Sequence, residues 1–217
     1  MKAPIFITGT GTDVGKTIAS VVIVDALEAQ YWKPVQAGID KNTDSQRIKK
    51  LSIHKTIIHP ETYKLKLAAS PHIAARQEGL RIDLDKIVSH YHELQTTGGQ
   101  LVIEGAGGLL VPLNEDEKVI DLIRKLNAKV ILVSRNYLGS INHSLLTAEV
   151  CRQHALNVAG WIFNDEYLDY EEEISHWSGY PVIGKIPNLE KISPKTLYHQ
   201  SSLLRNNLLR LLESVNT

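Results

Sequence analysis

The chain has 217 residues, of which 43% are apolar and 22% charged, proportions that are ordinary for a soluble globular protein. This length suffices for one α/β domain and is short for two, so we expect residues 1–217 to form a single domain. Lys and Arg together number 24, as do Asp and Glu, so no overall charge favours binding to nucleic acid or to an anionic surface.

Short apolar runs rich in β-branched residues alternate with longer amphipathic stretches. The runs are continuous rather than alternating, which is typical of parallel strands covered on both faces. The order of elements favours an α/β fold with a mostly parallel, doubly wound sheet and helices on both faces. The expected strands are 5–7, 31–35, 101–103, 130–133, 158–163 and 181–183, and the expected helices are 16–29, 44–51, 83–94, 120–126, 141–154 and 170–176. Residues 60–79 are the least regular, and we expect a long loop with a short helix there.

Two features bear on location. The N-terminus enters the first expected strand within a few residues, without the apolar core of a signal peptide, and no span of about 18 apolar residues follows. The one cysteine, Cys151, excludes an intramolecular disulfide and is compatible with a reducing compartment. We therefore expect a cytoplasmic protein with no membrane partner.

The strongest local motif is GTGTDVGKT at residues 9–17, between the first strand and the first helix. In such a loop, backbone N–H groups converge on phosphate oxygens, Lys16 reaches the β- and γ-phosphates, and Thr17 places its hydroxyl on Mg²⁺. Five residues separate Gly9 from Gly15, one more than in the usual pattern, so that, read strictly, the motif begins at Thr10. In this position the motif predicts that the α/β fold is of the P-loop NTPase type, and it predicts nucleotide binding by Asp13, Val14, Gly15, Lys16, Thr17 and Ile18.

A second lysine and two carboxylates stand where the sheet should bring them to the same edge, because ligands bind outside the carboxyl ends of parallel strands. Lys33 lies near the end of the second expected strand, and Glu104 follows the third, next to glycines that let a ligand approach. Two ammonium groups there can hold the γ-phosphate and an anionic acceptor together, although a surface lysine is the alternative for Lys33. Asp44 starts a helix, where Asp44 or Thr43 can be the N-cap. Thr17, Asp44 and Glu104 form a reasonable set of oxygen ligands for Mg²⁺.

In this combination the chain resembles the dethiobiotin synthetases, whose phosphate loop carries the same extra residue. The resemblance runs in order from residue 5 to about 190, and the combination of motifs is specific although each motif alone is not. The shared motifs are residues 9–17, Lys33-Pro34-Val35, Ser70-Pro71-His72, and residues 104–108, 138–143, 146–148, 159–165 and 184–187.

The resemblance implies a ligase of biotin biosynthesis that forms C–N bonds from ATP, CO₂ and 7,8-diaminononanoate. One amine becomes a carbamate and receives the γ-phosphate, and the second amine then closes the cyclic urea, which gives dethiobiotin, ADP and phosphate. Lys16 and Lys33 would be the catalytic residues, and Thr17, Asp44 and Glu104 would hold Mg²⁺. Further nucleotide-binding residues would be Gly105, Ala106 and Gly107, then Asn164 and Asp165 at the adenine, and Pro187, Asn188 and Leu189 beside the base.

The resemblance also implies a homodimer with the substrate at its interface. The loop 139–142 would offer hydrogen-bond donors to the substrate carboxylate from the other subunit, and a helix N-terminus behind Ser140 suits that role. A simple N-cap is the alternative for Ser140. The expected substrate-binding residues are Thr12, Lys33, Ala37, Ser140, Ile141 and Asn142.

Three other classes share parts of the pattern. A P-loop switch ATPase of the partition or division-site type would have a second lysine at the start of the loop, where this chain has Gly9 and Thr10. Some of those proteins carry a basic amphipathic C-terminal helix for membranes; the corresponding stretch here fits that use, but we expect it to pack on the domain. A cobalamin-type amide ligase needs a glutaminase domain, for which 217 residues leave no room, and a simple nucleotide-binding module would need neither Lys33 nor Glu104. The residues of the C-terminal stretch are Leu204, Leu208, Leu211 and Val215, with Arg205 and Arg210 nearby.

Overall fold

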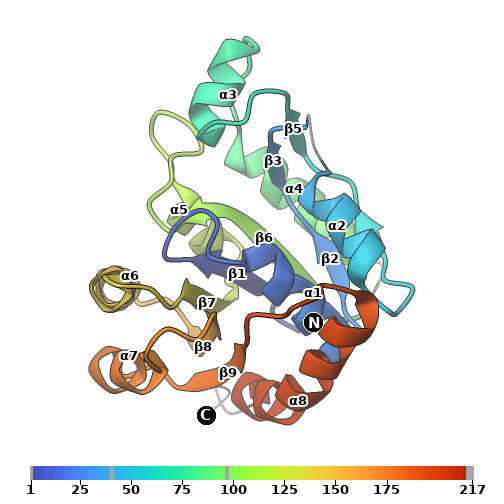
Figure 1. Cartoon of the computed structure of the whole chain (residues 1–217). Helices are drawn as coiled ribbons and strands as arrows, with labels where there is room; N and C mark the ends of the chain where they lie inside the picture. The colour runs from blue at the N-terminus through green and yellow to red at the C-terminus, as the bar shows by residue number, and fades with distance from the viewer. Residues whose placement is uncertain (1, 40–41, 96–97, 214–217) are drawn as a thin grey trace.

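Seven parallel strands form a sheet in the order β4-β2-β6-β1-β7-β8-β9 in the computed structural model, which describes residues 2–39, 42–95 and 98–213 (Figure 1). The expected α/β architecture is confirmed, with helices on both faces of a parallel sheet. The strands are β1 (Ile5–Gly9), β2 (Gln30–Trp32), β4 (Ile58–His59), β6 (Leu101–Gly108), β7 (Lys129–Arg135), β8 (Val158–Asn164) and β9 (Val182–Ile186).

The apolar core lies in two layers, one on each face of the sheet. Because successive side chains of a strand point to opposite faces, Val102 of β6 belongs to one layer and its neighbours Leu101 and Ile103 belong to the other. Three helices supply the layer that contains Val102, namely α1 (Lys16–Leu27), α2 (Asp44–Leu51) and α8 (Pro194–Glu213). The other layer receives side chains from α3 (Pro71–Gln77), α4 (Leu84–Gln95), α5 (Val119–Lys125), α6 (Ser140–Gln153) and α7 (Glu171–Ser178).

The second expected strand, 31–35, is not one strand but two. Strand β2 ends at Trp32, and β3 (Val35–Ala37) leaves the main sheet to pair with β5 (Tyr63–Leu65). Pro34 explains the break, because it has no N–H with which to continue the hydrogen bonding of an interior strand. Its carbonyl instead accepts a hydrogen bond from the backbone N–H of Tyr63 (2.9 Å), which starts the small sheet. This small sheet and α3 form the upper part of the molecule in Figure 1.

Other boundaries differ from the expected ones by a few residues. Strand β6 continues to Gly108, so that Glu104 lies within the strand rather than after it. Helix α6 begins at Ser140, with Gly139 as its N-cap at φ 104°, so Ser140 is the first residue of the helix and not its cap. Thr43 is the N-cap of α2 and forms a capping box with Gln46. The irregular segment holds a short helix as expected, α3, and also β5.

Helix α8 packs on the sheet and on α1. Leu204 and Leu208 are buried, and the close approach of the helix needs a glycine, because a Cβ on Gly184 would lie 2.6 Å from Leu204 Cγ. Packing of this apolar face is therefore confirmed for its described residues; the side chain of Leu211 and all of Val215 lie outside them. Within the described ranges, no helix combines the length and the apolar character needed to cross a bilayer.

Candidate functional site

A cavity of about 690 Å³ opens where the carboxyl ends of β1, β2 and β6 meet. It is bounded by the loop before α1, the turn between β2 and β3, the start of α2 and the segment that leads into α3. This is the position at which open α/β sheets bind their ligands. Its lining residues are Thr12, Asp13, Gly15, Lys16, Thr17, Ile18, Lys33, Val35, Gln36, Ala37, Asp44, Arg47, Ala68, Ala69, Ser70, Pro71, Glu104, Ala106, Gly107 and Val111.

The loop before α1 has the backbone of a phosphate-binding turn. Gly15 has φ 91°, a conformation that favours glycine, and a Cβ there would lie 2.4 Å from Nδ2 of Asn164. Lys16 is buried and donates a hydrogen bond from Nζ to the carbonyl of Gly11 (2.7 Å), which curls its side chain over the loop. Burial, together with the nearby charge of Lys33, lowers the pKa of Lys16 to about 8.

Three oxygens from three elements converge beside Lys16. The hydroxyl Oγ1 of Thr17 lies 2.7 Å from Oδ1 of Asp44 and 2.9 Å from Oε1 of Glu104. That hydroxyl has one proton and can donate it to only one of the two carboxylates at a time. Two carboxylates and a hydroxyl drawn this closely together need further positive charge between them.

Lys33 supplies part of that charge. Its Nζ lies 2.8 Å from Oδ2 of Asp44 and 3.3 Å from Oε1 of Glu104. Burial alone would lower the pKa of Lys33, but the carboxylates of Glu104 and Asp44 outweigh it and raise the pKa above its usual value. Burial alone would likewise raise the pKa of Asp44, whereas the charge and hydrogen bond of Lys33 hold it below its usual value. Both groups are therefore ionised at neutral pH.

Glu104 is held from behind by two hydroxyls that the motifs did not reveal. Ser20 Oγ lies 2.8 Å from Oε2 of Glu104, and the hydroxyl of Tyr31 donates to the same oxygen at 2.9 Å. Burial and the charge of Glu104 raise the pKa of Tyr31 well above its usual value, so this phenol stays a donor. The two contacts leave Oε1 facing Thr17 and Lys33.

The arrangement fits a divalent cation of the Mg²⁺ type. Mg²⁺ takes oxygen ligands from one or two carboxylates and leaves its other positions to water and substrate phosphate. Thr17, Asp44 and Glu104 offer such a set, and a cation there would relieve the crowding of their oxygens. Within the described residues, no group of three or more His, Cys, Asp or Glu side chains is placed to hold an ion by itself, so phosphate and water would have to complete the shell.

A second cavity, of about 230 Å³, lies on the other side of the phosphate loop, at the ends of β7, β8 and β9. Nδ2 of Asn164 donates to the carbonyl of Val14 (2.6 Å), so the end of β8 is fastened to the loop. Asp165 is ion-paired with Arg135, a residue that sequence reasoning did not single out. The lining residues are Asp13, Val14, Gly15, Ile18, Arg135, Asn164, Asp165, Ile186, Pro187, Asn188, Leu189 and Ile192.

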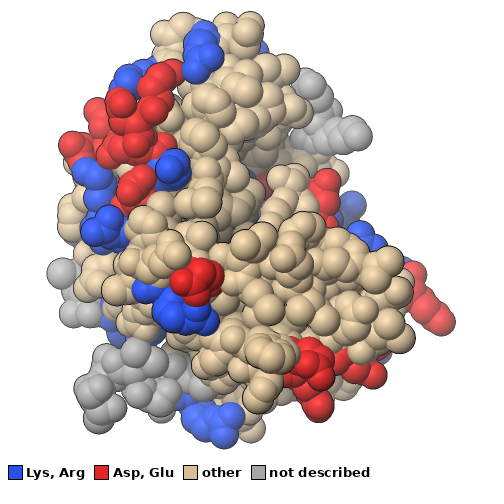
Figure 2. Space-filling model, turned by 90° about the vertical axis from the view of Figure 1, so that its left-hand side faces the viewer, with Lys and Arg blue, Asp and Glu red and all other residues tan. Residues whose placement is uncertain are grey.

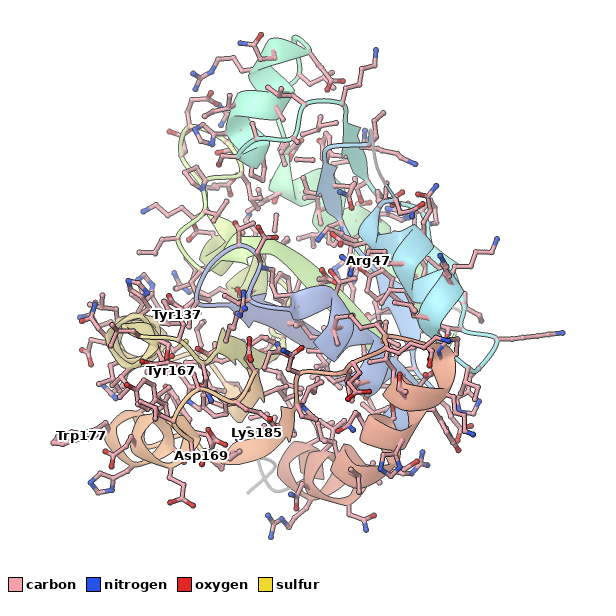
Figure 3. The ribbon with its side chains drawn as sticks, in the orientation of Figure 1. Arg47, Tyr137, Tyr167, Asp169, Trp177 and Lys185 are labelled. Carbon is pink, nitrogen blue, oxygen red and sulfur yellow. The ribbon has the colours of Figure 1, made fainter. Side chains whose placement is uncertain are left out.

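Three charged side chains are labelled in Figure 3, namely Arg47, Asp169 and Lys185. Arg47 of α2 lines the larger cavity one helical turn after Asp44. Lys185 of β9 lies close to Asp169 in the view, and its Nζ is 2.7 Å from Oδ1 of Asp169 and 2.7 Å from Oε1 of Glu171. These two ion pairs fasten the segment after β8 beside the smaller cavity.

Most of the residues expected at the site line one of the two cavities. The exceptions are Gly105 and the three residues at the start of α6, Ser140, Ile141 and Asn142, which line neither. Gly105 instead places its carbonyl 3.4 Å from Nζ of Lys33. The start of α6 is therefore not part of the cavity built by one copy of the chain.

Similarity to known proteins falls into one family over most of the chain. Residues 3–196 match a protein family described as an AAA domain. The chain is 48% identical to an ATP-dependent dethiobiotin synthetase from Cytophaga hutchinsonii, over 88% of this chain and 92% of that protein. It is 44% identical to an ATP-dependent dethiobiotin synthetase from Christiangramia forsetii, over 86% of this chain and 88% of that protein.

Solved structures with the same fold include ATPases of other families. A ParA-family ATPase from Chlorobium tepidum superposes with a TM-score of 0.55 at 13% identity, over 98% of this chain and 95% of that one. The septum site-determining protein MinD from Pyrococcus horikoshii, solved in complex with Mg-ADP, superposes with a TM-score of 0.55 at 12% identity, over 100% of this chain and 97% of that one. At such identities the likeness shows the P-loop fold alone.

Proposed function

This chain belongs to the dethiobiotin synthetase family and is thus an ATP-dependent ligase, and we propose that it closes the urea ring of dethiobiotin from ATP, CO₂ and 7,8-diaminononanoate. The observation that carries the proposal is the meeting of Lys16, Lys33 and the Thr17–Asp44–Glu104 oxygens at one cavity. Phosphoryl transfer asks a protein mainly for positioning and for stabilisation of charge, and this cavity offers both.

The two lysines divide the work. Lys16, on the phosphate loop, binds the β- and γ-phosphates once ATP displaces its contact with the carbonyl of Gly11. Lys33 faces the carbamate that forms from one amine and CO₂, and its ammonium screens the repulsion between this anion and the γ-phosphate as they approach. The carbamate oxygen takes the phosphoryl group and ADP leaves. The second amine then attacks the carbamate carbon, its N–H proton passes to solvent, and inorganic phosphate departs.

The metal set has a supporting role. When bound, Mg²⁺ would neutralise charge on the β- and γ-phosphates. Thr17, Asp44 and Glu104 would hold it, while Ser20 and Tyr31 keep Glu104 turned toward it. Lys33 already sits between the same two carboxylates, so the loading of ATP and metal would free its ammonium to face the carbamate.

The nucleotide base would occupy the smaller cavity. Asn164 spends one N–H on the carbonyl of Val14, which leaves its Oδ1 to accept from the exocyclic amine of adenine. Pro187, Asn188 and Leu189 would cover the base from the β9 side. Thr12 and Ala37 line the larger cavity, where the diamine would lie. A cytoplasmic location fits this function, because both ATP and the diamine substrate would be available there.

A homodimer would complete the substrate site. The start of α6 lies outside both cavities, yet it carries a Gly139 cap and exposed Asn142 suited to a carboxylate. Exposed apolar side chains lie just before α6 and along α6 and α7, among them Leu138, Leu146 and Trp177, which are 78%, 59% and 65% exposed. Figure 2 shows a broad stretch without charged residues on this side of the molecule, and Figure 3 shows Trp177 projecting outward from it. A second copy seated there would bring Ser140, Ile141 and Asn142 to the cavity of its partner.

The partition-type switch ATPase is set aside as the function. Its members share the fold with this chain at 10–16% identity, whereas the dethiobiotin synthetases share 40–48% of residues over most of the chain. The C-terminal helix that could have served a membrane buries Leu204 and Leu208 in the core.

The proposal is tested by the dependence of ATP hydrolysis on the diamine. Purified protein with ATP, Mg²⁺ and bicarbonate should release ADP only when 7,8-diaminononanoate is present, with one dethiobiotin formed per ADP. A monoamine of the same chain length is the control, since it can form a carbamate but cannot close a ring. ADP release that is indifferent to the diamine would refute the proposal.

A further inference from the structure

The base-side cavity contains a planar cation that the proposed reaction does not use. Arg135 is the last residue of β7 and lines this cavity opposite the apolar side chains of Pro187, Leu189 and Ile192. Its side chain is 55% exposed, so one part of the guanidinium faces open space. The inference below rests on the proposed binding of a nucleotide base in this cavity.

The carboxylate of Asp165 binds the edge of the Arg135 guanidinium and so fixes the orientation of its plane. Nε of Arg135 donates to Oδ2 of Asp165 at 3.0 Å, and a terminal nitrogen of the same guanidinium also lies 3.0 Å from that oxygen. Because both contacts use N–H groups in the plane, the two flat faces of the guanidinium stay available for stacking.

Asp165 is itself fixed. It has φ 72°, and its other oxygen, Oδ1, accepts the backbone N–H of Glu166 at 3.1 Å. The segment that follows is tied to β9 through the ion pairs of Lys185 with Asp169 and Glu171. Asp165 thus faces Arg135 with both carboxylate oxygens engaged, and it supports the arginine.

No other stacking surface is present among the described residues of this cavity. Its lining has aliphatic, proline, amide and acidic side chains, and none of those described is aromatic. A nucleobase is usually held by a flat partner, either an aromatic ring or the plane of an arginine, with hydrogen bonds on its edge. The side chain of Asn164 can hydrogen-bond to the edge of the base, and the guanidinium of Arg135 can stack on its face.

We propose that Arg135, held in its plane by Asp165, stacks on the purine base of the nucleotide and sets the affinity of the enzyme for the base half of ATP. The stack is a binding contact, remote from the transferring phosphoryl group. It should therefore contribute equally to ATP and ADP, and nothing to a phosphate chain that has no base.

Two substitutions distinguish the effect of the planar guanidinium from the effect of its positive charge. Arg135→Lys keeps a cation that can still pair with Asp165 but has no plane, and Arg135→Leu removes both. Stacking of a base on a cationic or aromatic plane predicts that each variant raises the dissociation constants of ATP and ADP by about tenfold. The inhibition constant of inorganic tripolyphosphate, which has no base, should not change, and kcat at saturating ATP should be that of the unaltered protein.

The matched control is Arg205→Lys with Arg205→Leu. Arg205 of α8 is 45% exposed and ion-paired with Glu28 at 3.7 Å, and it lines neither cavity, so its loss should leave nucleotide affinity unchanged. Equal weakening of tripolyphosphate and ATP in Arg135→Leu would show that Arg135 acts by charge on the phosphates, and would overturn the proposal. So would unchanged ADP affinity in both Arg135 variants.

The outcome is separable from that of the proposed function. ADP binding is measured without diamine, by calorimetry on the unaltered protein and the variants. If the unaltered protein binds ADP but shows no diamine-dependent turnover, the assigned reaction fails while the stacking contact remains open to this test. If it binds neither ATP nor ADP, both fail together.

Discussion

Lys16 and Lys33 lie on the wall of the same cavity, and their surroundings move their pKa values in opposite directions. Lys16 is buried beside another cation, and its pKa falls to about 8. Lys33 is buried between two carboxylates, and its pKa rises. An arriving anion would therefore stabilise the charged form of Lys16. The charge of Lys33 is already balanced by Asp44 and Glu104, and it becomes available to a substrate anion when these carboxylates bind a metal ion instead.

The low pKa of Lys16 predicts a pH dependence of ATP capture. A lysine is charged below its pKa, so Lys16 is fully charged only well below pH 8, is half charged near its pKa of about 8 and loses its charge as the pH rises further. Because kcat/KM reports the free enzyme, its value for ATP should fall above that pH, by about tenfold per unit once the lysine is mostly neutral. Bound phosphate favours the charged lysine, so kcat should stay level to a higher pH. A kcat/KM profile that is flat from pH 7 to 10 would contradict the assignment.

Tyr31 is expected to act as a positioning residue for Glu104. Tyr31→Phe removes the donor at 2.9 Å from the buried Oε2 and leaves Ser20 as its other hydroxyl contact; loss of a hydrogen bond to a charged group costs about 1.5–3 kcal/mol of unfolding free energy. Loss of such an outer contact should also raise the Mg²⁺ concentration for half-maximal activity by roughly tenfold. Denaturant titration and a Mg²⁺ titration of the ATPase measure the two effects.

Tyr91→Phe is the matched control for this substitution. The hydroxyl of Tyr91 accepts from the half-buried amide of Gln95 and lines neither of the two cavities. Its loss should leave the Mg²⁺ titration unchanged. A Tyr31→Phe enzyme with unaltered Mg²⁺ dependence would show that Glu104 needs no such support.

At the scale of residues, the sequence could predict only those site residues that stand within a recognisable local motif. Lys16, Thr17 and Glu104 stand in glycine-rich motifs and were found. Tyr31 and Ser20 contact Glu104 across 73 and 84 positions, and Arg135 contacts Asp165 across 30, so their partners are set by the sheet and not by spacing. The roles assigned to the motif residues stay predictions until the variants are measured.

At the scale of elements, the turn into α1 depends on a glycine with no room for a side chain. Gly15→Ala would need φ near 91° and would put a methyl group 2.4 Å from Nδ2 of Asn164. We expect the variant to push Asn164 off the carbonyl of Val14 and to weaken ATP binding by at least tenfold, as measured by calorimetry. Its fold should survive, since the clash is with the end of one side chain.

Gly11→Ala in the same loop is the comparison. A Cβ on Gly11 would meet nothing within 4 Å, so its effect on ATP binding should be much the smaller of the two. Equal losses in the two variants would mean that the loop tolerates no side chain anywhere, and that Asn164 has no special part in it.

Elements were predictable where periodicity had enough residues to show itself. The apolar runs of β1, β6, β7 and β8 and the amphipathic helices were expected within a few residues of their observed bounds. Strands β4 and β5 have two and three residues, too few for any pattern to be visible. Ser140 was expected to precede α6, but Gly139 takes the cap because its left-handed backbone turns the chain into the helix.

At the scale of the whole molecule, the parallel sheet gathers distant residues at one edge. The phosphate loop, Lys33, Glu104 and Asn164 follow or belong to four different strands, β1, β2, β6 and β8, and the strand order places β1 between β6 and β7. Sequence reasoning could predict this edge from the parallel sheet. It could not predict that the edge would divide into two cavities on either side of the phosphate loop.

The proposed dimer predicts complementation between two inactive variants. Lys33→Ala should bind ATP but not turn over, and Asn142→Asp should place a carboxylate against that of the substrate. If each site joins the cavity of one subunit to the α6 start of the other, a co-expressed equal mixture has one sound site in half of its dimers, and activity should return to about one quarter.

The two variants expressed singly are the controls, with sedimentation to show that each still dimerises. If both parts of a site came from the same subunit, the mixture would be as inactive as its components. A monomeric enzyme with full activity would remove the dimer from the proposal altogether.

The two cavities share the wall formed by Asp13, Gly15 and Ile18. For inhibitor discovery this makes the phosphate loop a narrow partition between two separately addressable pockets, one with aliphatic side chains and Arg135, the other with two lysines and two carboxylates. A fragment chosen for each pocket needs only a short tether across the partition. A short flexible tether gives the second fragment an effective concentration of about millimolar, so two weak fragments can combine into a strong bidentate inhibitor.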